Sequence, residues 1–398
     1  MFIKIRKERF GYIFFDRNNR NHHFVETEEK LELMDNNQIV AYLAKLFRFN
    51  PPEMKWEFIF PKNNEAPLSA PIGMYLEISP LCNLNCGHCY KPKSELKEPL
   101  SLLQFKKLID NLHEMGIFEI RICGNEPTTS PFLFEIAEYI KAKDMYLGIN
   151  TNGYFDDDFQ EQMVGIRPDF IAISIDGNQK THDAIRKNGS YDRAVSFLAR
   201  LSNEPLKRRI NSIVSKLTIE VMENTAILAN KFRAEVSFIP FRPIGKNDAF
   251  KKLNVIDKND MLRSVREVMR LREKYPDITI MTYFDILSDK ATYHHSMSFN
   301  SPCPSRKNGF ITHDGNFFPC DFLRYLGDKF YCGNVAKTEF WKLWNNSATL
   351  HNFQNIKHDR CQECCFYLTH CHGGCISGSL SDPSNPKDEL CFIDILKK

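Results

Sequence analysis

The sequence lacks the features that would tie a protein to a membrane or to nucleic acid. It has no run of about 18 apolar residues, which excludes an ordinary transmembrane helix. The N-terminal stretch MFIKIRKERFGYIFF carries charges every few positions and has no apolar centre, so it is not expected to be a signal peptide. The net charge is only +3, and no Lys/Arg block interleaved with aromatic residues occurs. We therefore expect a cytoplasmic protein that binds neither nucleic acid nor membrane.

Cysteine is absent between Cys123 and Cys303, which is almost half of the chain, although the sequence has 13 cysteines. Three of them, Cys82, Cys86 and Cys89, lie within eight residues, and nine lie between Cys303 and Cys391. In a chain without a secretory signal, clustered thiols more often bind metal or do redox work than form disulfides. The gap therefore separates two cysteine-bearing modules.

The first cysteine cluster has the spacing CxxxCxxC and no fourth cysteine nearby. Thiolate cages usually close at four ligands, so three closely grouped thiolates indicate a site with one position left open. The alternative is a structural zinc site that takes a distant fourth ligand.

Strand-like and helix-like segments alternate six times from residue 73 to about residue 242. The strand segments are apolar runs, and most are continuous and not alternating, which is typical of buried parallel strands. This alternation predicts an α/β fold with a parallel sheet, a partial (β/α)6 barrel of the TIM type. Chemistry in such sheets collects at the C-terminal strand ends, and the first cysteine cluster begins three residues after the first strand.

Four regions are predicted along the chain. Residues 1–70 form a small β-hairpin and helix followed by a linker rich in Pro and Asn. Residues 71–250 form the partial barrel, and residues 251–300 form a bridging helical region. Residues 301–398 are rich in cysteine and poor in long periodic segments, which indicates a fold held together by metal.

The strand-end motifs, taken in order, resemble those of the radical S-adenosylmethionine (SAM) enzymes. After CxxxCxxC come CGNEP, NTNG and SIDG, each directly behind a predicted strand. The resemblance implies that Cys82, Cys86 and Cys89 hold a [4Fe–4S] cluster whose fourth iron binds the methionine moiety of SAM. One electron from the cluster then releases a 5′-deoxyadenosyl radical.

The resemblance also implies a set of cofactor-binding residues. CGNEP is similar to the family's GGEP stretch, with Asn125 in place of the second glycine; Asn tolerates positive φ better than most residues. Ser174 is expected near the ribose or carboxylate of the cofactor, and Arg186 is a candidate carboxylate partner. NTNG and SIDG also fit ordinary turns, and Arg186 also fits a solvated surface position. The complete predicted set is Gly124, Asn125, Glu126, Pro127, Asn150, Ser174 and Arg186.

One further cysteine and three histidines are expected to have no role in the site. Cys123 is expected to pack within its strand. The histidines His182, His294 and His295 are expected on the surface.

The C-terminal cysteines resemble the auxiliary-cluster module of this family that is known as SPASM. The resemblance implies two auxiliary [4Fe–4S] clusters, one held by Cys303, Cys320 and Cys375, the other by Cys361, Cys364, Cys371 and Cys391. Cys365 competes with Cys364 as a ligand. The fourth position of the first auxiliary cluster is open to Cys332, solvent or a substrate group, and Cys332 also fits a buried small hydrophobic residue. The alternative for the whole region is a pair of zinc knuckles.

The segment FPCDF is similar to one in the sulfatase-maturing branch of the family. There an acidic residue takes up a proton as the substrate is oxidised, which makes Asp321 a candidate general base. An Asp that only forms hydrogen bonds in a turn fits the pattern equally well.

The resemblance implies an oxidising enzyme that acts on a ribosomally made precursor peptide. We expect it to abstract a hydrogen and to form a thioether or carbon–carbon crosslink, with electrons from a flavodoxin- or ferredoxin-type donor. The N-terminal unit is expected to capture a leader peptide by β-strand addition. The alternatives are oxidation of Cys or Ser to formylglycine in a sulfatase, and a non-catalytic iron–sulfur electron carrier, which would not require GNEP, Ser174 or Arg186.

Overall fold

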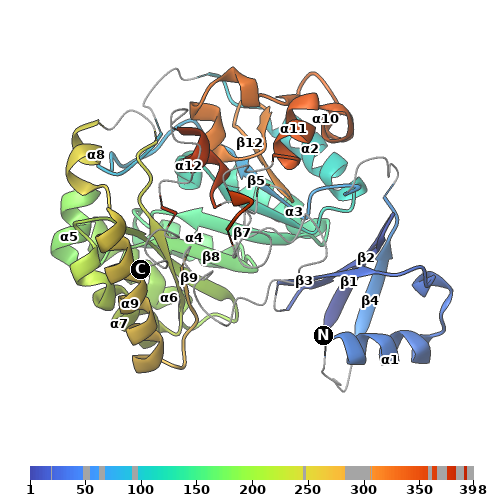
Figure 1. The fold of residues 1–398 in the computed structure, drawn as a ribbon, viewed down its shortest axis with the longest axis horizontal. Helices are drawn as coiled ribbons and strands as arrows, with labels where there is room; N and C mark the ends of the chain where they lie inside the picture. The colour runs from blue at the N-terminus through green and yellow to red at the C-terminus, as the bar shows by residue number, and fades with distance from the viewer. Residues whose placement is uncertain are drawn as a thin grey trace.

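The computed structural model describes residues 1–18, 20–47, 54–61, 68–91, 97–244, 248–282, 305, 307–356, 361–364, 374–381 and 390–391. Within these residues the strands form a four-stranded sheet near the N-terminus and a ten-stranded sheet in the main body (Figure 1). No helix among them is long and apolar enough to cross a membrane.

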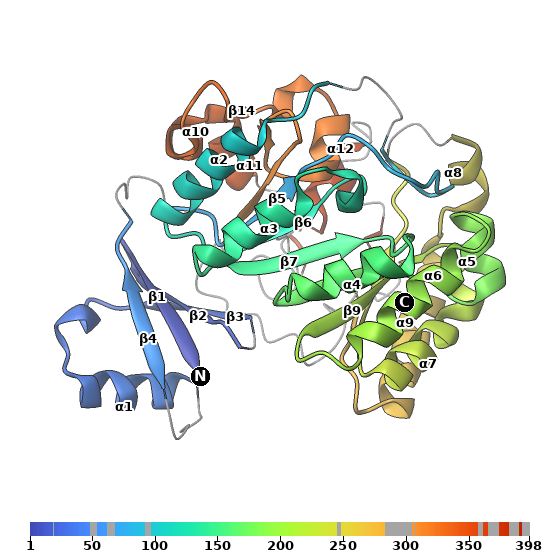
Figure 2. The same cartoon turned by 180° about the vertical axis from the view of Figure 1, so that it is seen from behind.

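The main body is the predicted parallel barrel segment. Its six central strands are adjacent in sequence order and pair in parallel: β5 (Gly73–Glu77), β6 (Glu119–Cys123), β7 (Tyr146–Thr151), β8 (Phe170–Ser174), β9 (Lys207–Val214) and β10 (Glu235–Pro240). Helices lie on the outside of the sheet (Figure 2). They are α2 (Leu102–Glu114), α3 (Leu133–Ala142), α4 (Asp157–Gly165), α5 (Gln179–Ile185), α6 (Ser190–Leu201) and α7 (Met222–Phe232). The α/β prediction is confirmed.

Alternation along the strands separates an outer apolar layer from the interior of the barrel. In β6, Ile120 and Ile122 are fully buried in the main core, while Glu119, Arg121 and Cys123 occupy the other face. The interior of the barrel is therefore lined by polar as well as apolar side chains. Beyond β10, helices α8 (Asp248–Asn254) and α9 (Lys258–Lys274) lead to β11 (Ile280–Thr282) at one edge of the sheet.

The cysteine-rich region continues the barrel sheet. Its first strand, β12 (Asn308–Ile311), pairs in parallel with β5, and β13 (Asn316–Phe318) and β14 (Gly333–Asn334) follow antiparallel. Helices α10 (Phe340–Asn346), α11 (Ala348–Gln354) and α12 (Ile376–Ser381) cover this part. The buried Trp344 donates its indole N–H to Leu68 O at 2.9 Å, so α10 is tied to the segment that leads into β5.

The N-terminal unit is larger than the sequence suggested. Its sheet has the order β3-β2-β1-β4, with β1 (Phe2–Glu8), β2 (Gly11–Asp16), β3 (Asn21–Glu26) and β4 (Lys55–Ile59), and helix α1 (Asn36–Phe47) packs on it. The prediction of β2, β3 and the helix is correct. The prediction missed β1, and it placed β4 in the linker because Pro51 and Pro52 precede it.

The N-terminal unit packs against the end of the barrel where strands begin. Phe15 stacks on Phe118, the residue before β6, with ring centroids 5.1 Å apart. The buried Arg6 donates to Pro71 O at 2.8 Å and to Gly116 O at 3.1 Å, and both carbonyls precede barrel strands. Because the cysteine cluster follows the C-terminal end of β5, the N-terminal unit lies at the opposite end of the barrel (Figures 1 and 2).

Candidate active site

The first cysteine cluster lies on a loop that is fastened to neighbouring strand ends. Leu81 O accepts from Glu126 N at 3.0 Å, so the loop after β5 is bonded to the loop after β6. Gly87 N donates to Ile185 O at 2.7 Å, and Cys89 N donates to Cys86 O at 3.1 Å in a tight turn. These bonds place the three thiols at the C-terminal rim of the barrel.

Two polar side chains point at the sulfurs of this loop. Arg186 Nη1 lies 3.9 Å from Cys86 Sγ, and Asn152 Nδ2 lies 4.0 Å from Cys82 Sγ. Burial, Glu126 and the two neighbouring thiols raise the pKa of Cys82 to about 11, which shows that the three sulfurs are electrostatic neighbours. A positively charged group bound among them would favour the thiolate forms.

The donor set fits an iron–sulfur cluster. Thiolates are the soft ligands that iron–sulfur clusters take, and Arg186 and Asn152 are suited to donate hydrogen bonds to negatively charged sulfur. Within the described residues, no three His, Cys, Asp or Glu side chains are close enough to share a single metal ion. The fit to an iron–sulfur cluster therefore rests on the chemistry of the thiolate ligands and of the hydrogen-bond donors around them.

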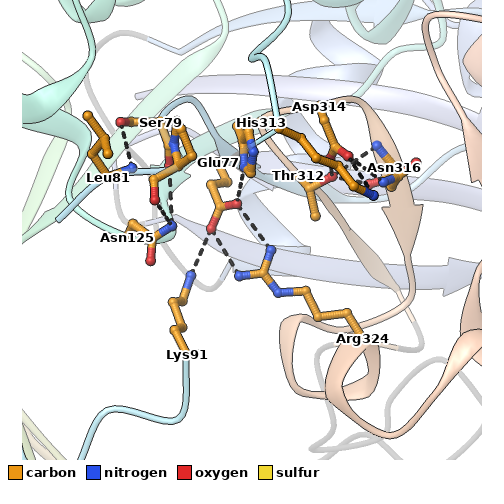
Figure 3. A network of polar contacts seen from close by, with 12 residues as sticks. Glu77, Ser79, Leu81, Lys91, Asn125, Thr312, His313, Asp314, Asn316 and Arg324 are labelled. Atoms are coloured by element: carbon orange, nitrogen blue, oxygen red, sulfur yellow. Dashed lines mark hydrogen bonds and ion pairs between the residues drawn. The ribbon is translucent and has the colours of Figure 1, made fainter. Parts of the chain in front are cut away.

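The GNEP segment has a backbone turn at Gly124 and not at Asn125. Gly124 has φ +113°, and a Cβ there would lie 2.5 Å from Glu77 Cγ. Asn125 has a negative φ, so this position does not depend on the tolerance of Asn for positive φ. Its side chain donates instead to Pro80 O at 3.0 Å, which ties the turn to the cysteine loop (Figure 3).

Glu126 joins the ends of β6 and β7. It is 1% exposed, and its carboxylate accepts from Thr151 Oγ1 at 2.7 Å and from Asn152 N at 2.8 Å. Burial raises the pKa of this carboxyl group in spite of these donors. Pro127 follows as the first residue of a short 3-10 helix, Pro127–Thr129. Glu126 thus fixes NTNG beside the cysteine loop.

Arg186 is buried and paired. Its Nε donates to Asp176 Oδ2 at 2.7 Å, and Asp176, which is fully buried, also accepts from Ile213 N at 2.8 Å. Although burial alone would raise the pKa of Asp176, Arg186 lowers it to about 2. The prediction that His182 lies on the surface is wrong: it is fully buried, and its Nδ1 accepts from Asp176 N at 3.1 Å.

Asn150 and Ser174 lie on the interior face of adjacent strands. Asn150 pairs with Ala172 in the β7–β8 ladder, and Ser174 ends β8. Asn150 Oδ1 is buried without a hydrogen-bond partner in the described part of the chain. The two residues are thus close to the rim, and their contact with SAM stays a prediction, as does that of Arg186.

A buried ion-pair network connects the barrel to the cysteine-rich region (Figure 3). Its centre is Glu77, the last residue of β5, which is 1% exposed. Lys91 Nζ lies 2.9 Å from Glu77 Oε2, Arg324 contacts both oxygens at 3.1 Å, and His313 Nδ1 lies 2.8 Å from Oε1. Although burial alone would raise the pKa of Glu77, Lys91, His313 and Arg324 hold it well below its usual range.

Asp321 belongs to the same network. Tyr90 OH donates to Asp321 Oδ2, Lys91 Nζ lies 3.3 Å from that oxygen, and Arg324 Nε lies 3.0 Å from Oδ1. Tyr90 directly follows Cys89, and Asp321 directly follows Cys320. The network thus joins the residue after one predicted cluster ligand to the residue after another.

The auxiliary cysteines are described in part. Cys320, Cys361, Cys364, Cys375 and Cys391 are all partly exposed. Cys364 N donates to Cys361 O at 2.9 Å, the same turn that Cys86 and Cys89 make. Cys303 and Cys371, and the competing Cys365, lie outside the described residues, so both ligand sets stay predictions.

Cys123 and Cys332 are buried. Cys123 is 9% exposed at the end of β6, which confirms its packing role. Cys332 is 7% exposed within the main core, and burial raises the pKa of its thiol to about 12. Its surroundings favour the packing interpretation over a ligand role.

Sequence reasoning missed several members of the site. Asp176 lies inside the SIDG motif, so its place after a strand was a usable signal. Glu77 and Lys91 flank the cysteine loop, but His313 and Arg324 come from 236 and 247 residues away from Glu77. No local pattern indicates pairs so distant in sequence.

Three thiols on the first strand-end loop, followed around the rim by GNEP, NTNG and SIDG, define a radical SAM enzyme. The radical SAM superfamily matches residues 76–226, and the iron–sulfur cluster-binding domain SPASM matches residues 303–366. The chain is therefore a radical SAM enzyme with a C-terminal SPASM domain. Its cofactors are a [4Fe–4S] cluster with SAM and auxiliary iron–sulfur clusters.

The chain is similar in sequence to two named groups of proteins. It is 27% identical over 337 residues to the mycofactocin maturase MftC of Mycolicibacterium smegmatis, a match that covers 79% of this chain and 80% of that protein. It is 26% identical over 308 residues to the AdoMet-dependent heme synthase of Methanosarcina barkeri, covering 73% and 86%.

The fold is similar to that of two solved enzymes. SuiB of Streptococcus suis bound to S-adenosylmethionine superposes with a TM-score of 0.75 at 16% identity, covering 98% of both chains. Native anSMEcpe with bound AdoMet superposes with a TM-score of 0.63 at 18% identity, covering 81% of this chain and 95% of that one. At these identities the likeness shows the fold alone.

Proposed function

We propose that this enzyme matures a ribosomally made precursor peptide by abstracting a hydrogen atom and forming a thioether or carbon–carbon crosslink. The observation that carries the proposal is the N-terminal sheet, whose outer strand β3 is an unpaired edge among the described residues, packed on a radical SAM barrel. Radical chemistry on a small metabolite has no need of a strand-binding edge.

Relatives support a peptide substrate. MftC carries the name of a maturase, and SuiB has been solved bound to its precursor peptide SuiA. The match to SuiB covers 98% of this chain, and therefore includes most of the N-terminal sheet. The name of the heme synthase relative does not point to a peptide substrate, so the proposal rests on the N-terminal unit of this chain.

The proposed chemistry divides between the cofactors and the chain. When bound at Cys82, Cys86 and Cys89, the [4Fe–4S] cluster and SAM supply a 5′-deoxyadenosyl radical, and we propose a flavodoxin- or ferredoxin-type protein as the electron donor. The crosslink removes two hydrogen atoms from the peptide, so a second electron and a proton must leave. Auxiliary clusters, when bound, would supply an acceptor for the electron, and we propose that Asp321 takes up the proton.

The position of Asp321 suits this role. It follows the predicted auxiliary ligand Cys320, and it is partly exposed, at 17% for its side chain. Tyr90 and Lys91 contact one of its oxygens and orient the carboxylate. A carboxylate so oriented between the two cysteine-bearing modules is within reach of a peptide that crosses from one to the other.

The outer edge of β3 is the proposed site for the leader peptide. Thr27 N donates inward to Phe10 O at 3.0 Å. Because inward and outward groups alternate along an antiparallel strand, the N–H groups of Glu26 and Phe24 point away from β2. They are available as donors for an added strand.

The main test is maturation of a candidate peptide. Short reading frames beside the gene are expressed together with the enzyme, and the peptides are analysed by mass spectrometry. We expect one peptide to lose the mass of two hydrogen atoms, and the reconstituted enzyme to form 5′-deoxyadenosine in proportion. Unmodified peptides in the presence of rapid 5′-deoxyadenosine formation would exclude this function.

The β3 edge has a matched test. Glu26→Pro removes an outward N–H from an exposed position, and Glu26→Ala removes the same side chain but keeps the N–H. We expect Glu26→Pro to weaken binding of the full-length peptide several-fold and Glu26→Ala to leave it unchanged, as measured by fluorescence anisotropy. Equal binding by both variants would place the leader elsewhere.

The second candidate function is oxidation of Cys or Ser to formylglycine. The observation that favours it is Asp321 directly after Cys320, next to Tyr90. A Cys-containing sulfatase peptide then becomes an aldehyde without prior leader binding. An electron carrier, the third candidate, forms no 5′-deoxyadenosine, so that measurement separates it from both enzymes.

A further inference from the structure

The interior of the barrel contains a layer of four residues in register. Tyr75 pairs with Arg121, Arg121 with Gly148, and Gly148 with Phe170, across strands β5 to β8. Arg121 extends across this layer. Its guanidinium carbon lies 4.6 Å from the centre of the Phe170 ring, and a Cβ on Gly148 would lie 3.3 Å from its Nε. The absence of a side chain at Gly148 therefore leaves room for the arginine.

Arg121 is buried with its hydrogen-bonding edge unused. It is 7% exposed, and within the described part of the chain its Nε and Nη2 atoms are buried without a partner. These two N–H groups lie on the same side of the guanidinium and form the fork that binds a carboxylate through two parallel bonds. Burying a donor without an acceptor costs its desolvation free energy, so the retention of these two groups calls for an explanation.

Two neighbouring arginines show what this edge binds in the same barrel. Arg20 uses Nε and Nη2 to bind the carboxylate of Glu119, and Arg209 uses the same atoms to bind Glu235. Both guanidinium groups also face the Phe170 ring, at 5.7 and 4.9 Å. The third arginine of this group, Arg121, has the same edge and no carboxylate.

The charges around this layer do not balance. Three guanidinium groups face two carboxylates, those of Glu119 and Glu235, and the nearby Lys207 has Glu235 and Asp16 as counter-charges. Among these described side chains four positive groups thus face three carboxylates, and the unused hydrogen-bond donors are those of Arg121. The position is matched to one added carboxylate.

We propose that Arg121 binds a carboxylate of the substrate inside the barrel through its Nε and Nη2 atoms. This inference rests on the proposed function, because the carboxylate belongs to a peptide, either at an Asp or Glu side chain or at its C-terminus. Arg121 lies two residues before the end of β6, about 7 Å below the rim where Arg186 contacts the cysteine loop. It thus anchors the substrate beneath the cofactor and selects for peptides with an acidic group near the reacting residue.

The test is thermal unfolding of the anaerobically reconstituted holoenzyme in the presence of SAM. The probes are N-acetyl-glutamic acid α-amide for a side-chain carboxylate, N-acetyl-alanine for a chain-terminal one, N-acetyl-alanine amide as the neutral control, and inorganic phosphate. At ten times its Kd, a bound carboxylate raises the midpoint by about 2 °C. We expect this rise with at least one carboxylate and not with the amide. Which carboxylate gives the larger rise identifies its source.

Two variants complete the test. Arg121→Gln is expected to lose the response, and Arg200→Gln, which removes an equal charge from a surface pair with Glu161, is expected to keep it. Because Nε and Nη2 of Arg121 have no hydrogen-bond partner among the described residues, replacing the guanidinium by an amide is not expected to lower the midpoint without probe. A large loss of stability in Arg121→Gln alone, an equal response to phosphate, or no response to either carboxylate would overturn the proposal.

The outcome is separate from that of the proposed function. The measurement requires no peptide turnover. If the holoenzyme responds to carboxylates through Arg121 but modifies no peptide, the proposed anion site is supported and the proposed maturase function is excluded. If the holoenzyme modifies a peptide but does not respond to carboxylates, only the proposed anion site is excluded.

Discussion

Lys91 Nζ lies 2.9 Å from Glu77 Oε2, so the cysteine loop is closed by an ion pair between the residue that ends β5 and a residue two positions beyond Cys89. Arg324 of the SPASM domain binds the same carboxylate. One buried carboxylate therefore fastens the cluster loop and the auxiliary domain to the barrel.

Glu77→Gln is expected to lower the free energy of unfolding by about 3–5 kcal/mol, because it removes the more deeply buried of the two carboxylates, Glu77 and Asp321, that Lys91 and Arg324 share. Thermal unfolding of the reconstituted enzyme measures this. The control is Glu161→Gln, which breaks an exposed pair with Arg200 and is expected to cost less than about 1 kcal/mol. Equal effects of the two changes would show that the network does not support the fold.

The comparison of wild type with Glu77→Gln also gives a prediction about pH. The pKa of Glu77 is held well below its usual range, so its carboxylate stabilises the folded state at every pH above the ordinary carboxyl value of about 4.3. That contribution is lost only as the pH falls through the lowered pKa. We expect the difference in melting temperature between wild type and Glu77→Gln to be equal at about pH 6 and pH 8. A difference that shrinks over this interval would contradict the assignment.

Gly124 and Asn125 are expected to differ sharply in tolerance. Gly124→Ala places a Cβ 2.5 Å from Glu77 Cγ at φ +113°, so it should abolish most 5′-deoxyadenosine formation by displacing the turn. Asn125→Gly removes the side-chain hydrogen bonds to Pro80 O and Ser79 O and should cost only about 1–2 kcal/mol of stability, with activity largely kept. The rate of 5′-deoxyadenosine formation, followed with thermal unfolding, checks both. A more damaging Asn125→Gly would reverse this ranking.

Asp176→Asn is expected to raise the KM for SAM in the formation of 5′-deoxyadenosine. Asp176 accepts from Arg186 Nε and from Ile213 N, and an amide in its place presents a donor to one of them. The matched control is Asp157→Asn in the exposed pair with Arg193, which should leave the KM unchanged. An unchanged KM for Asp176→Asn would remove Arg186 from the cofactor site.

Cys332→Ala is expected to keep the full iron content. The thiol is buried among apolar residues, and Sγ lies 3.5 Å from Phe330 O. Cys320→Ala is expected to lower the iron content by up to one cluster. Iron and sulfide analysis after identical reconstitution measures both, and a loss of iron in Cys332→Ala would identify it as the fourth ligand.

The parallel strands could be predicted because most are apolar runs of strand length, and helical segments separate them. The strand β1 could not, because Arg6 and Glu8 look solvent-exposed in sequence and are fully buried or nearly so in the structure. Arg6 finds its acceptors at Pro71 and Gly116, which no local pattern brings near.

The site was predictable where it follows the order of strand ends. Cys82, Gly124 and Arg186 meet at one rim because parallel strands place their C-terminal ends together. His182 was misplaced because its partner is a backbone N–H, that of Asp176, which exists only once the strand end is folded. The unused edge of Arg121 is likewise visible only when its neighbours are counted in space.

The placement of the N-terminal sheet sets a minimum distance between the proposed leader site and the cysteine rim. A peptide held on β3 at the start of the barrel strands must travel at least the length of β6, five residues, to reach the rim. At about 3.3 Å per residue this is roughly 17 Å, and the route around the barrel is longer. With the leader bound at the proposed β3 site, we expect precursors with fewer than about five residues between the bound leader segment and the modified residue to be too short for processing in one bound state.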